Sequence, residues 1–408
     1  MMKKILFIGL CFLMVGVFTV PATALEHVFG GYFRVRAYSW TNFTGDDSYN
    51  GEAQQTDTRA RLYYTAVLSD DVKLVTKFEM DAYFGDDARG DIGADGQNFE
   101  IKNSYVDIDL DDFNLKLGTQ GKTLARGFML DDDFSGAVVT YMGDDMEIPF
   151  FWIKAYEGYN DPTDPDLYDN DFDVDYYGVD PTFSMGDIQL NPVLMYITSA
   201  DAQNWAKTAD YEALNLYYLG VNLDYAADMF SVWFTGIYQS GTLEELASGD
   251  DVNVAASLAA VGGAYNMDAF SVHAQAFYAS GDDDANTFMI PKGQSYYWAE
   301  IMGYGLIDEA VSDSAPGDQI SNIMAFNVGV TVPLGKLTLM ADLWNASLAE
   351  DNASGDKDLG TEIDLAASYP LKENVKLQAV AAYLLAGDAT GGGDENPTEV
   401  GVRLSLSF

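Results

Sequence analysis

Arginine side chains recur at alternate positions in the first part of this chain. Arg34 and Arg36 are two residues apart, as are Arg59 and Arg61. A guanidinium group binds a carboxylate or a phosphate through a planar pair of N–H donors. Side chains at positions i and i+2 project from the same face of a β-strand. These arginines can therefore form charged rows, whose chemistry is the attraction and orientation of polar solutes.

Groups that could break or form covalent bonds are scarce. The chain has two histidines, His27 and His273, and the sequence around His273 offers no evident carboxylate to orient it as a base. The one cysteine, Cys11, lies in the N-terminal segment. The remainder therefore has no thiolate nucleophile, disulfide or thiolate metal site. We expect no enzymatic activity, no cofactor and no bound metal.

Residues 1–24 have the features of a secretory leader. Lys3 and Lys4 precede an apolar stretch from Ile5 to Val20, and Ala22-Thr23-Ala24 fits a signal-peptidase site. We expect the mature chain, residues 25–408, to begin at Leu25. An uncleaved anchor is the alternative, although the apolar stretch is short for a bilayer span. Residues 8–10 lack the small residue that lipoprotein processing at Cys11 needs, so a lipid anchor is not expected.

The charge of the chain is strongly acidic, with 64 Asp plus Glu against 21 Lys plus Arg and a net charge of −43. Nucleic acid is not expected as a partner, because phosphate binding needs the opposite sign of charge. Disorder is not expected either, since 13% of the residues are aromatic.

Alternation of apolar and polar residues predicts the elements that position the arginines. In residues 31–38, Phe33, Val35 and Ala37 alternate with polar or aromatic residues. The same period of two predicts strands in 59–68, 72–84, 113–120, 337–343, 375–385 and 400–408. No later run of about 18 apolar residues predicts a transmembrane helix.

The connections between the predicted strands alternate between short and long. Short turns are expected near 69–71, 111–112, 143–145, 184–187, 226–228, 267–268, 333–335 and 371–374. Long acidic or glycine-rich loops are expected near 42–54, 85–97, 121–135, 160–171, 200–211, 241–252, 281–321, 349–357 and 387–397. This pattern is typical of an all-β transmembrane barrel with short periplasmic turns and long extracellular loops. We predict about 18 antiparallel strands of about 10–14 residues; a soluble sandwich or propeller is the alternative.

Aromatic residues near strand ends support a membrane location. Phe150-Phe151-Trp152, Tyr176-Tyr177, Tyr217-Tyr218 and Tyr296-Tyr297-Trp298 fit interfacial girdles. The last strand alternates from Val400 and ends in Phe408. This ending resembles the signal read by the outer-membrane barrel assembly machinery. We therefore expect outer-membrane lipid, lipopolysaccharide and that machinery as partners.

Three stretches resemble the porin superfamily that includes alginate-export-type barrels and porins of metal-respiring Gram-negative bacteria. They are residues 126–133, 297–303 and 359–365. The resemblance implies an 18-stranded barrel in the outer membrane, with loops that fold inward and narrow the lumen. Alginate exporters are expected to have a dense arginine lining, of which this chain has only part.

The cost of placing charge in lipid predicts the inner face of each strand. An Arg or Lys facing the middle of the bilayer costs about 2–4 kcal/mol. We therefore assign to the pore lining Arg34, Arg36, Arg59, Arg61, Lys77, Glu79, Asp81, Lys116, Lys122, Asp342, Glu362 and Asp364, with Lys154 a further candidate. Because the first and last strands of a barrel are neighbours, the three late carboxylates are expected close to the arginines. For any single arginine, a structural ion pair is the alternative.

Three loops have additional features. Residues 121–135 carry Arg126, Asp131, Asp132 and Asp133 and are a candidate constriction loop; an acidic surface loop is the alternative. Asp169, Asp171, Asp173 and Asp175 alternate in another loop. They could attract calcium, but the glycine and terminal glutamate of an EF-hand are missing. The loop 281–321 could plug the mouth, bind a partner or form a surface cap, and residues 299–306 permit a short helix.

The predicted function is passive diffusion of small hydrophilic solutes through a water-filled porin whose charged lining biases permeation. A substrate-specific channel for anionic saccharides or organic acids is one alternative. A barrel that sheathes a periplasmic electron-transfer partner is another. Assembly as a monomer or a homotrimer is left open.

Overall fold

Strand-forming sequence accounts for nearly all of the regular structure. The computed structural model describes residues 25–42, 53–85, 99–157, 173–199, 211–245, 251–282, 286–307, 317–390 and 396–408. The leader and the outer parts of several predicted loops lie outside these ranges. Within them, no helix is long and apolar enough to cross a bilayer.

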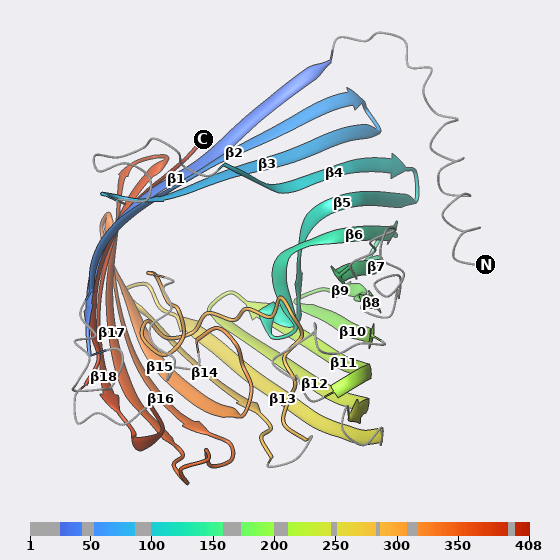
Figure 1. Cartoon of the computed structure of the whole chain (residues 1–408). Coiled ribbons are helices and arrows are strands. Elements are labelled where there is room, and N and C mark those ends of the chain that lie inside the picture. Colours follow the sequence, from blue (N-terminus) through green and yellow to red (C-terminus); the bar gives the residue numbers. More distant parts are fainter. Residues whose placement is uncertain are drawn as a thin grey trace.

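Nineteen β-segments form one antiparallel sheet within the described ranges (Figure 1). The first ten are β1 (Glu26–Thr41), β2 (Ala53–Ser69), β3 (Val72–Tyr83), β4 (Glu100–Leu110), β5 (Phe113–Leu124), β6 (Leu130–Met142), β7 (Met146–Tyr156), β8 (Val174–Val179), β9 (Thr182–Met185) and β10 (Ile188–Ser199). The others are β11 (Tyr211–Ala227), β12 (Phe230–Glu245), β13 (Asp251–Asn266), β14 (Ser271–Ala279), β15 (Ile323–Leu334), β16 (Leu337–Leu348), β17 (Asp358–Lys372), β18 (Val375–Ala386) and β19 (Thr398–Ser407).

The sheet closes into a barrel because β1 pairs with both β2 and β19. The final residue takes part in the closure: the Phe408 N–H donates to Gly31 O at 3.1 Å, and the Gly31 N–H donates to Phe408 O at 2.9 Å. The Phe408 ring also covers Gly31 so closely that a Cβ there would collide with it.

Two of the segments share one position in the barrel. Both β8 and β9 pair with β7 on one side and with β10 on the other. Asp180 and Pro181 separate them, and a proline has no N–H to donate to a neighbouring strand. Among the described residues the barrel therefore has 18 strand positions, which confirms the predicted architecture.

The predicted short turns are also confirmed. Each predicted short turn joins two consecutive segments, as Asp70 and Asp71 do between β2 and β3. Several strands are longer than the predicted 10–14 residues, since β2 and β11 each have 17. These long strands extend beyond the thickness of a bilayer, for which about 9–11 residues suffice.

Side-chain alternation separates an apolar outer face from an inner face that carries charge. On β17, the apolar side chains of Ile363 and Leu365 are 43% and 52% exposed. The carboxyl side chains that alternate with them, Glu362 and Asp364, are 0% and 4% exposed. Leu343 on β16 and Val400 and Val402 on β19 are likewise exposed. An outward apolar band is what the hydrocarbon of a membrane requires.

Two segments fold into the barrel interior (Figure 1). The first is the end of the β5–β6 hairpin with the short 3₁₀ helix η2 (Ala125–Gly127). The second comprises residues 286–307 and 317–322, between β14 and β15, which we call the inward loop. They contact each other, because Asp131 N–H donates to Gly293 O at 2.8 Å and Gln294 Nε2 donates to Phe128 O at 2.7 Å.

The inward loop crosses from one wall of the barrel to the other. Near its start, the Tyr218 hydroxyl on β11 donates to Met289 O at 2.9 Å. Further along, the Ile301 and Met302 N–H groups reach Glu362 on β17 at 2.6 and 2.9 Å. In the described part of this loop, residues 301–304 form turns, so the short helix at 299–306 is not formed.

Interior packing changes the interpretation of one aromatic cluster. Tyr177 and Tyr217 are on the outer face, as a girdle requires, while Tyr176 and Tyr218 are buried. The prediction that residues 296–298 belong to an interfacial girdle is wrong. Tyr296 stacks on Phe128 with ring centroids 3.8 Å apart, and Trp298 is buried inside the barrel.

Candidate functional site

A row of ion pairs crosses β1, β2 and β3. Arg36 donates to Asp57 from Nε at 3.0 Å and from Nη2 at 2.6 Å, and both residues are buried. Arg59 makes the same bidentate contact with Asp81, at 2.7 and 2.6 Å. Arg61 pairs with Glu79. The strand register dictates these contacts, because each arginine lies opposite its carboxylate on the next strand.

Arg34 extends the row without lying opposite a carboxylate. Its cross-strand partner on β2 is Arg59. Its side chain is buried. The predicted charged row is therefore a mixed row of arginines and carboxylates. Asp57, a member of it, was missed by the sequence analysis although it lies two residues before Arg59 and shares its parity.

Arg403 on β19 is a second residue that the sequence analysis missed. It lies opposite Arg36. Its Nη1 donates to Leu306 O in the inward loop at 3.0 Å, and its Nη2 donates to Gln378 at 3.0 Å. The sequence contained a signal for its position. Val402 and Leu404, on either side of Arg403, are exposed on the outer face, so the alternation along the strand places Arg403 on the inner face.

The structure corrects the predicted loop 121–135. β5 continues to Leu124 and β6 begins at Leu130, so Asp131, Asp132 and Asp133 lie on a strand. Asp132 pairs in register with Lys122. The two strands of the hairpin are therefore longer than predicted. Their connection consists of residues 125–129 only.

Arg126 lies at the tip of this hairpin, where the backbone is strained. Ala125 and Arg126 both have positive φ, at 49° and 60°, a conformation that costs a non-glycine residue of order 1–3 kcal/mol. The Arg126 guanidinium contacts Asp224 on β11 at 2.5 Å and stands over the Trp233 ring at 4.9 Å. These contacts fix the hairpin tip against β11 and β12.

A cavity of about 900 Å³ separates the row of arginines from the hairpin and the inward loop. We call it the charged cavity. Six basic side chains line it: Arg59, Arg61, Lys77, Lys102, Lys122 and Arg126. Four carboxylates line it: Asp131, Asp132, Asp133 and Asp318. Burial raises the pKa of Asp318, whose carboxylate accepts a hydrogen bond from Ser295 Oγ at 2.7 Å.

The lysines of the charged cavity have distinct partners. Lys122 Nζ pairs with Asp180 at 2.9 Å. Lys102, which the sequence analysis missed, lies between Glu79 at 3.6 Å and Asp133 at 3.5 Å. Lys77 Nζ lies 5.9 Å from the centroid of the Tyr63 ring. Lys116 is on β5 opposite Asp107 and does not line this cavity.

Asp342, Glu362 and Asp364 contact the inward loop and strands β14 and β15. The Arg36, Arg59 and Arg61 contacts go to carboxylates on β2 and β3 instead. Glu362 accepts two backbone N–H groups of the inward loop. Asp364 Oδ2 accepts the Glu300 N–H at 3.4 Å. These carboxylates hold the loop to the wall.

His273 has the orienting partner that the sequence did not reveal. Its Nε2 lies 2.6 Å from Asp342 Oδ1, which also accepts a hydrogen bond from Asn327 at 2.6 Å. The partner is 69 residues away in the chain and two strands away in the sheet. His27, the other histidine, is exposed and lies 2.8 Å from the Tyr64 hydroxyl.

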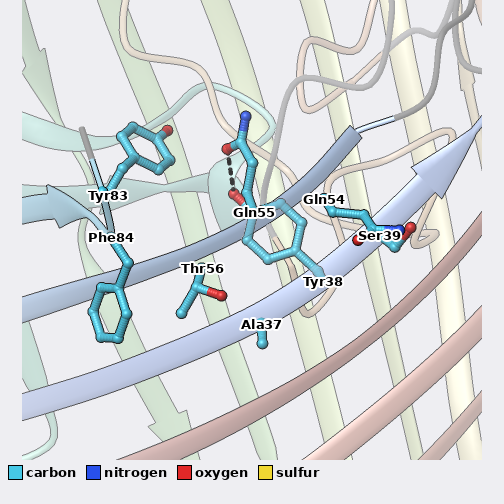
Figure 2. A pocket seen from close by; sticks show the side chains of 9 residues that line it. Ala37, Tyr38, Ser39, Gln54, Gln55, Thr56, Tyr83 and Phe84 are labelled. Carbon is cyan, nitrogen blue, oxygen red and sulfur yellow. Dashed lines mark hydrogen bonds between the residues drawn. The ribbon is translucent and has the colours of Figure 1, made fainter. Parts of the chain in front are cut away.

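A second cavity, of about 710 Å³, lies at the ends of β1, β2 and β3 on the side of the long loops. Figure 2 shows the Tyr38 hydroxyl bonded to Gln55, with Tyr83 and Phe84 beside it; the Tyr38–Gln55 distance is 3.1 Å. Parts of the neighbouring loops are outside the described residues, so we place no site there.

Half of the candidate calcium cluster can be located. Lys154 Nζ pairs with Asp173 at 2.8 Å and with Asp175 at 3.4 Å. These ion pairs compensate the charge of the Lys154 side chain. Asp169 and Asp171 lie outside the described residues. Among those that are described, no group of three or more His, Cys, Asp or Glu could hold a metal ion.

Comparisons with known proteins agree with the barrel. A family model described as Gram-negative porin matches residues 15–389. A comparison with curated proteins gave no match.

Solved structures with a similar fold cover most of the chain. OpdK of Pseudomonas aeruginosa, solved with vanillate, is 12% identical with a TM-score of 0.59, over 93% of this chain and 98% of that one. OccK9 (OpdG) of the same organism is 13% identical with a TM-score of 0.61, over 94% and 99%. OccAB3 of Acinetobacter baumannii is 10% identical with a TM-score of 0.60, over 93% and 99%. At this identity the likeness concerns the fold.

Proposed function

The chain belongs to the Gram-negative porin family, and we propose that solutes cross its barrel through the charged cavity. It is an outer-membrane porin for small hydrophilic solutes. Its family and fold are those of channels rather than enzymes.

One observation carries this proposal, namely that the charged cavity has basic and acidic groups on different elements. The basic groups come from β2, β3, β4 and the β5 hairpin, and the acidic ones from β6 and the inward loop. Opposite charges across a confined aqueous space create a local field that orients dipolar and charged solutes. We therefore propose as pore lining the cavity residues Arg59, Arg61, Lys77 and Lys122, with Arg126, Asp131, Asp132 and Asp133 at the constriction. We add Arg34, Arg36, Glu79 and Asp81, which belong to the adjoining row of ion pairs.

The ion pairs reduce the preference for anions that the arginines would give alone. Arg36, Arg59 and Arg61 each have a carboxylate within bonding distance, so their fields partly cancel. Lys102 and Lys122 also have carboxylates within 4 Å, so of the three lysines Lys77, which lies over the Tyr63 ring, contributes most of the uncompensated positive charge. We propose a modest preference for anions at the constriction, beneath an acidic, cation-attracting mouth.

A channel specific for small organic acids or anionic saccharides is the second candidate. The cluster of lysine side chains in the charged cavity supports it, because ammonium groups make exchangeable contacts with carboxylates. A barrel that sheathes a protein partner has less support. The hairpin and the inward loop leave about 900 Å³ beside the arginines, which is the scale of a small-molecule pocket.

Other features stay predictions. They are cleavage of the leader after Ala24, recognition of the Phe408 end by the assembly machinery, contact with lipopolysaccharide, and assembly as a homotrimer. The finer likeness to alginate-export-type barrels and to porins of metal-respiring bacteria also stays a prediction.

Planar-bilayer recording of the purified, folded protein tests the proposed path. We expect discrete ohmic openings in salt. A barrel that resists heat denaturation in detergent, and is therefore folded, but conducts no current would contradict the proposal and favour a structural role.

A further inference from the structure

The charged cavity has a smaller neighbour inside the barrel. A cavity of about 350 Å³ lies between the inward loop and strands β12 to β17. Three tryptophans line it: Trp233 on β12, Trp298 on the loop and Trp344 on β16. We call it the tryptophan cavity. No residue lines both cavities, so the two are separate spaces in this structure.

Two side-chain contacts lie between the cavities. The Arg126 guanidinium, which lines the charged cavity, stands 4.9 Å from the centre of the Trp233 ring, which lines the tryptophan cavity. The Tyr296 hydroxyl, in the lining of the charged cavity, donates to Gln275 Oε1 at 2.9 Å, and Gln275 lines the tryptophan cavity. Each contact joins one lining directly to the other. At these points the cavities are therefore separated by a single layer of side chains, which we call the partition.

One ion pair holds Arg126 in the partition. Its Nη2 donates to Asp224 Oδ1 on β11 at 2.5 Å, and Asp224 lines neither cavity. The two side chains are 26% and 41% exposed. An ion pair between partly exposed groups contributes little to stability and is weakened by salt. Neutralising Asp224 would therefore release the guanidinium without removing an atom from the lining of either cavity.

The conformation of the hairpin tip opposes the held position of Arg126. Ala125, Arg126 and Gly127 have φ of 49°, 60° and 93° in succession. This left-handed region is unfavourable for the first two, because each has a Cβ. Arg126 Nε is also buried and has no hydrogen-bond partner among the described residues, which is a second cost. Both costs are relieved if the tip changes conformation and Nε meets water.

We propose that Arg126 sets the size of the solutes that the barrel admits. While its guanidinium contacts Asp224 and Trp233, a solute has the charged cavity alone. When these contacts open, the two cavities join and larger solutes pass. This inference rests on the proposed path through the charged cavity. It gives Arg126 a positioning role that is separate from the charge it contributes to the constriction.

Asp224→Asn tests the latch formed by Arg126. Planar-bilayer recording with neutral polyethylene glycols of graded mass measures the largest polymer that enters the pore. We expect Asp224→Asn and Arg126→Ala both to admit larger polymers than the unaltered protein. Both should occupy a state of higher conductance about threefold more of the time, the effect of losing a partly exposed ion pair. Because the two changes alter the charge in opposite directions, a shared increase cannot come from the electrostatic field.

The double variant and a distant control complete this experiment. Arg126→Ala combined with Asp224→Asn should have no more effect than the larger single change, because both act on one contact. Asp228→Asn, in the turn between β11 and β12, removes the same charge away from the partition and should leave the polymer limit unchanged. An unchanged limit in a folded Asp224→Asn protein would overturn the proposal.

The unaltered protein gives a second measurement if the variants do not fold. Salt screens the ion pair, so the state of higher conductance should become about twofold more frequent between about 0.1 M and about 1 M potassium chloride. Equal occupancy at the two concentrations would overturn the proposal.

Thiol modification of Asp132→Cys distinguishes failure of the latch from failure of the path. If modification lowers the current and the polymer limit of Asp224→Asn is unchanged, the latch alone is wrong. If modification has no effect on the current, the path through the charged cavity is wrong and the latch fails with it.

Discussion

His273 and Asp342 meet across an intervening strand, with Nε2 and Oδ1 2.6 Å apart. Gly329 on β15 lies between them in register, opposite His273 on one side and Asp342 on the other. A Cβ at residue 329 would collide with both side chains. The pair therefore exists because the residue between its members is glycine.

Replacing this glycine should destabilise the barrel. In Gly329→Ala the methyl group must displace the histidine or the carboxylate, and overpacking of this kind costs about 1–3 kcal/mol. Urea unfolding followed by tryptophan fluorescence measures the loss. Gly220→Ala is the matched control, because a Cβ there would make ordinary contacts at 3.4 and 3.6 Å. Equal free energies of unfolding for the two variants would contradict this prediction, because they would show that His273 and Asp342 can separate without loss of stability.

Glu362 should be the anchor of the inward loop. Glu362→Ala leaves the Ile301 and Met302 N–H groups without their acceptor, at about 1–3 kcal/mol for each buried group. We expect the loop to detach more often, which gives larger and noisier single-channel currents. Glu373→Ala, in the turn between β17 and β18, is the control. Unchanged current in Glu362→Ala would show that other contacts hold the loop.

Docking of the inward loop should depend on pH through Glu300. In the docked loop its pKa is raised to about 7, from an ordinary value of 4.5. The docked state therefore holds the proton more tightly, and the stability this gives is lost as the pH rises from about 4.5 through 7. We expect current fluctuations to increase between pH 6 and pH 8.

The control for this pH dependence is Glu300→Gln, which keeps an acceptor for the Leu306 N–H, now 2.6 Å from the carboxylate. The variant should show a weaker pH dependence over the same range. An identical pH response in the variant would assign the titration to Asp364, Glu362 or another facing group.

The arginine row should influence which ions pass. Substituting Arg34, Arg36, Arg59 and Arg61 together by Gln removes four positive charges and leaves Asp57, Glu79 and Asp81 in place. We expect the reversal potential in a salt gradient to shift toward cation selectivity. Lys73→Gln and Lys376→Gln, both exposed near the short turns, should produce no shift. Unchanged selectivity in the fourfold variant would contradict the pore-lining assignment.

Parity along the strands predicted much of the inner wall. Glu362 and Asp364 are inside and Ile363 is outside, as the cost of charge in lipid requires. The same rule could have found Arg403, which lies between two outward residues. Parity does not tell which inward residues meet, because that depends on register. Asp57, Glu79 and Asp81 are therefore the partners of the arginines, and Asp342 is not.

The interior segments could not be predicted from local patterns. Residues 130–133 carry three consecutive aspartates that suggest a loop, yet they continue a strand because the hairpin packs on Gly293 and Gln294 of the inward loop. Tyr296 and Trp298 resemble girdle residues in sequence. Their position inside the barrel depends on Phe128 and Trp344, which are more than 40 residues away.

The most direct test of the central proposal is chemical modification inside the charged cavity during current recording. Residues 25–408 contain no cysteine, so Asp132→Cys introduces a single thiol beside the arginine row. We predict that a charged methanethiosulfonate reagent lowers the unitary conductance in one step, while modification of Asp70→Cys leaves it unchanged. Full labelling of Asp132→Cys, verified by mass, with unaltered conductance would contradict the proposal that solutes cross the charged cavity.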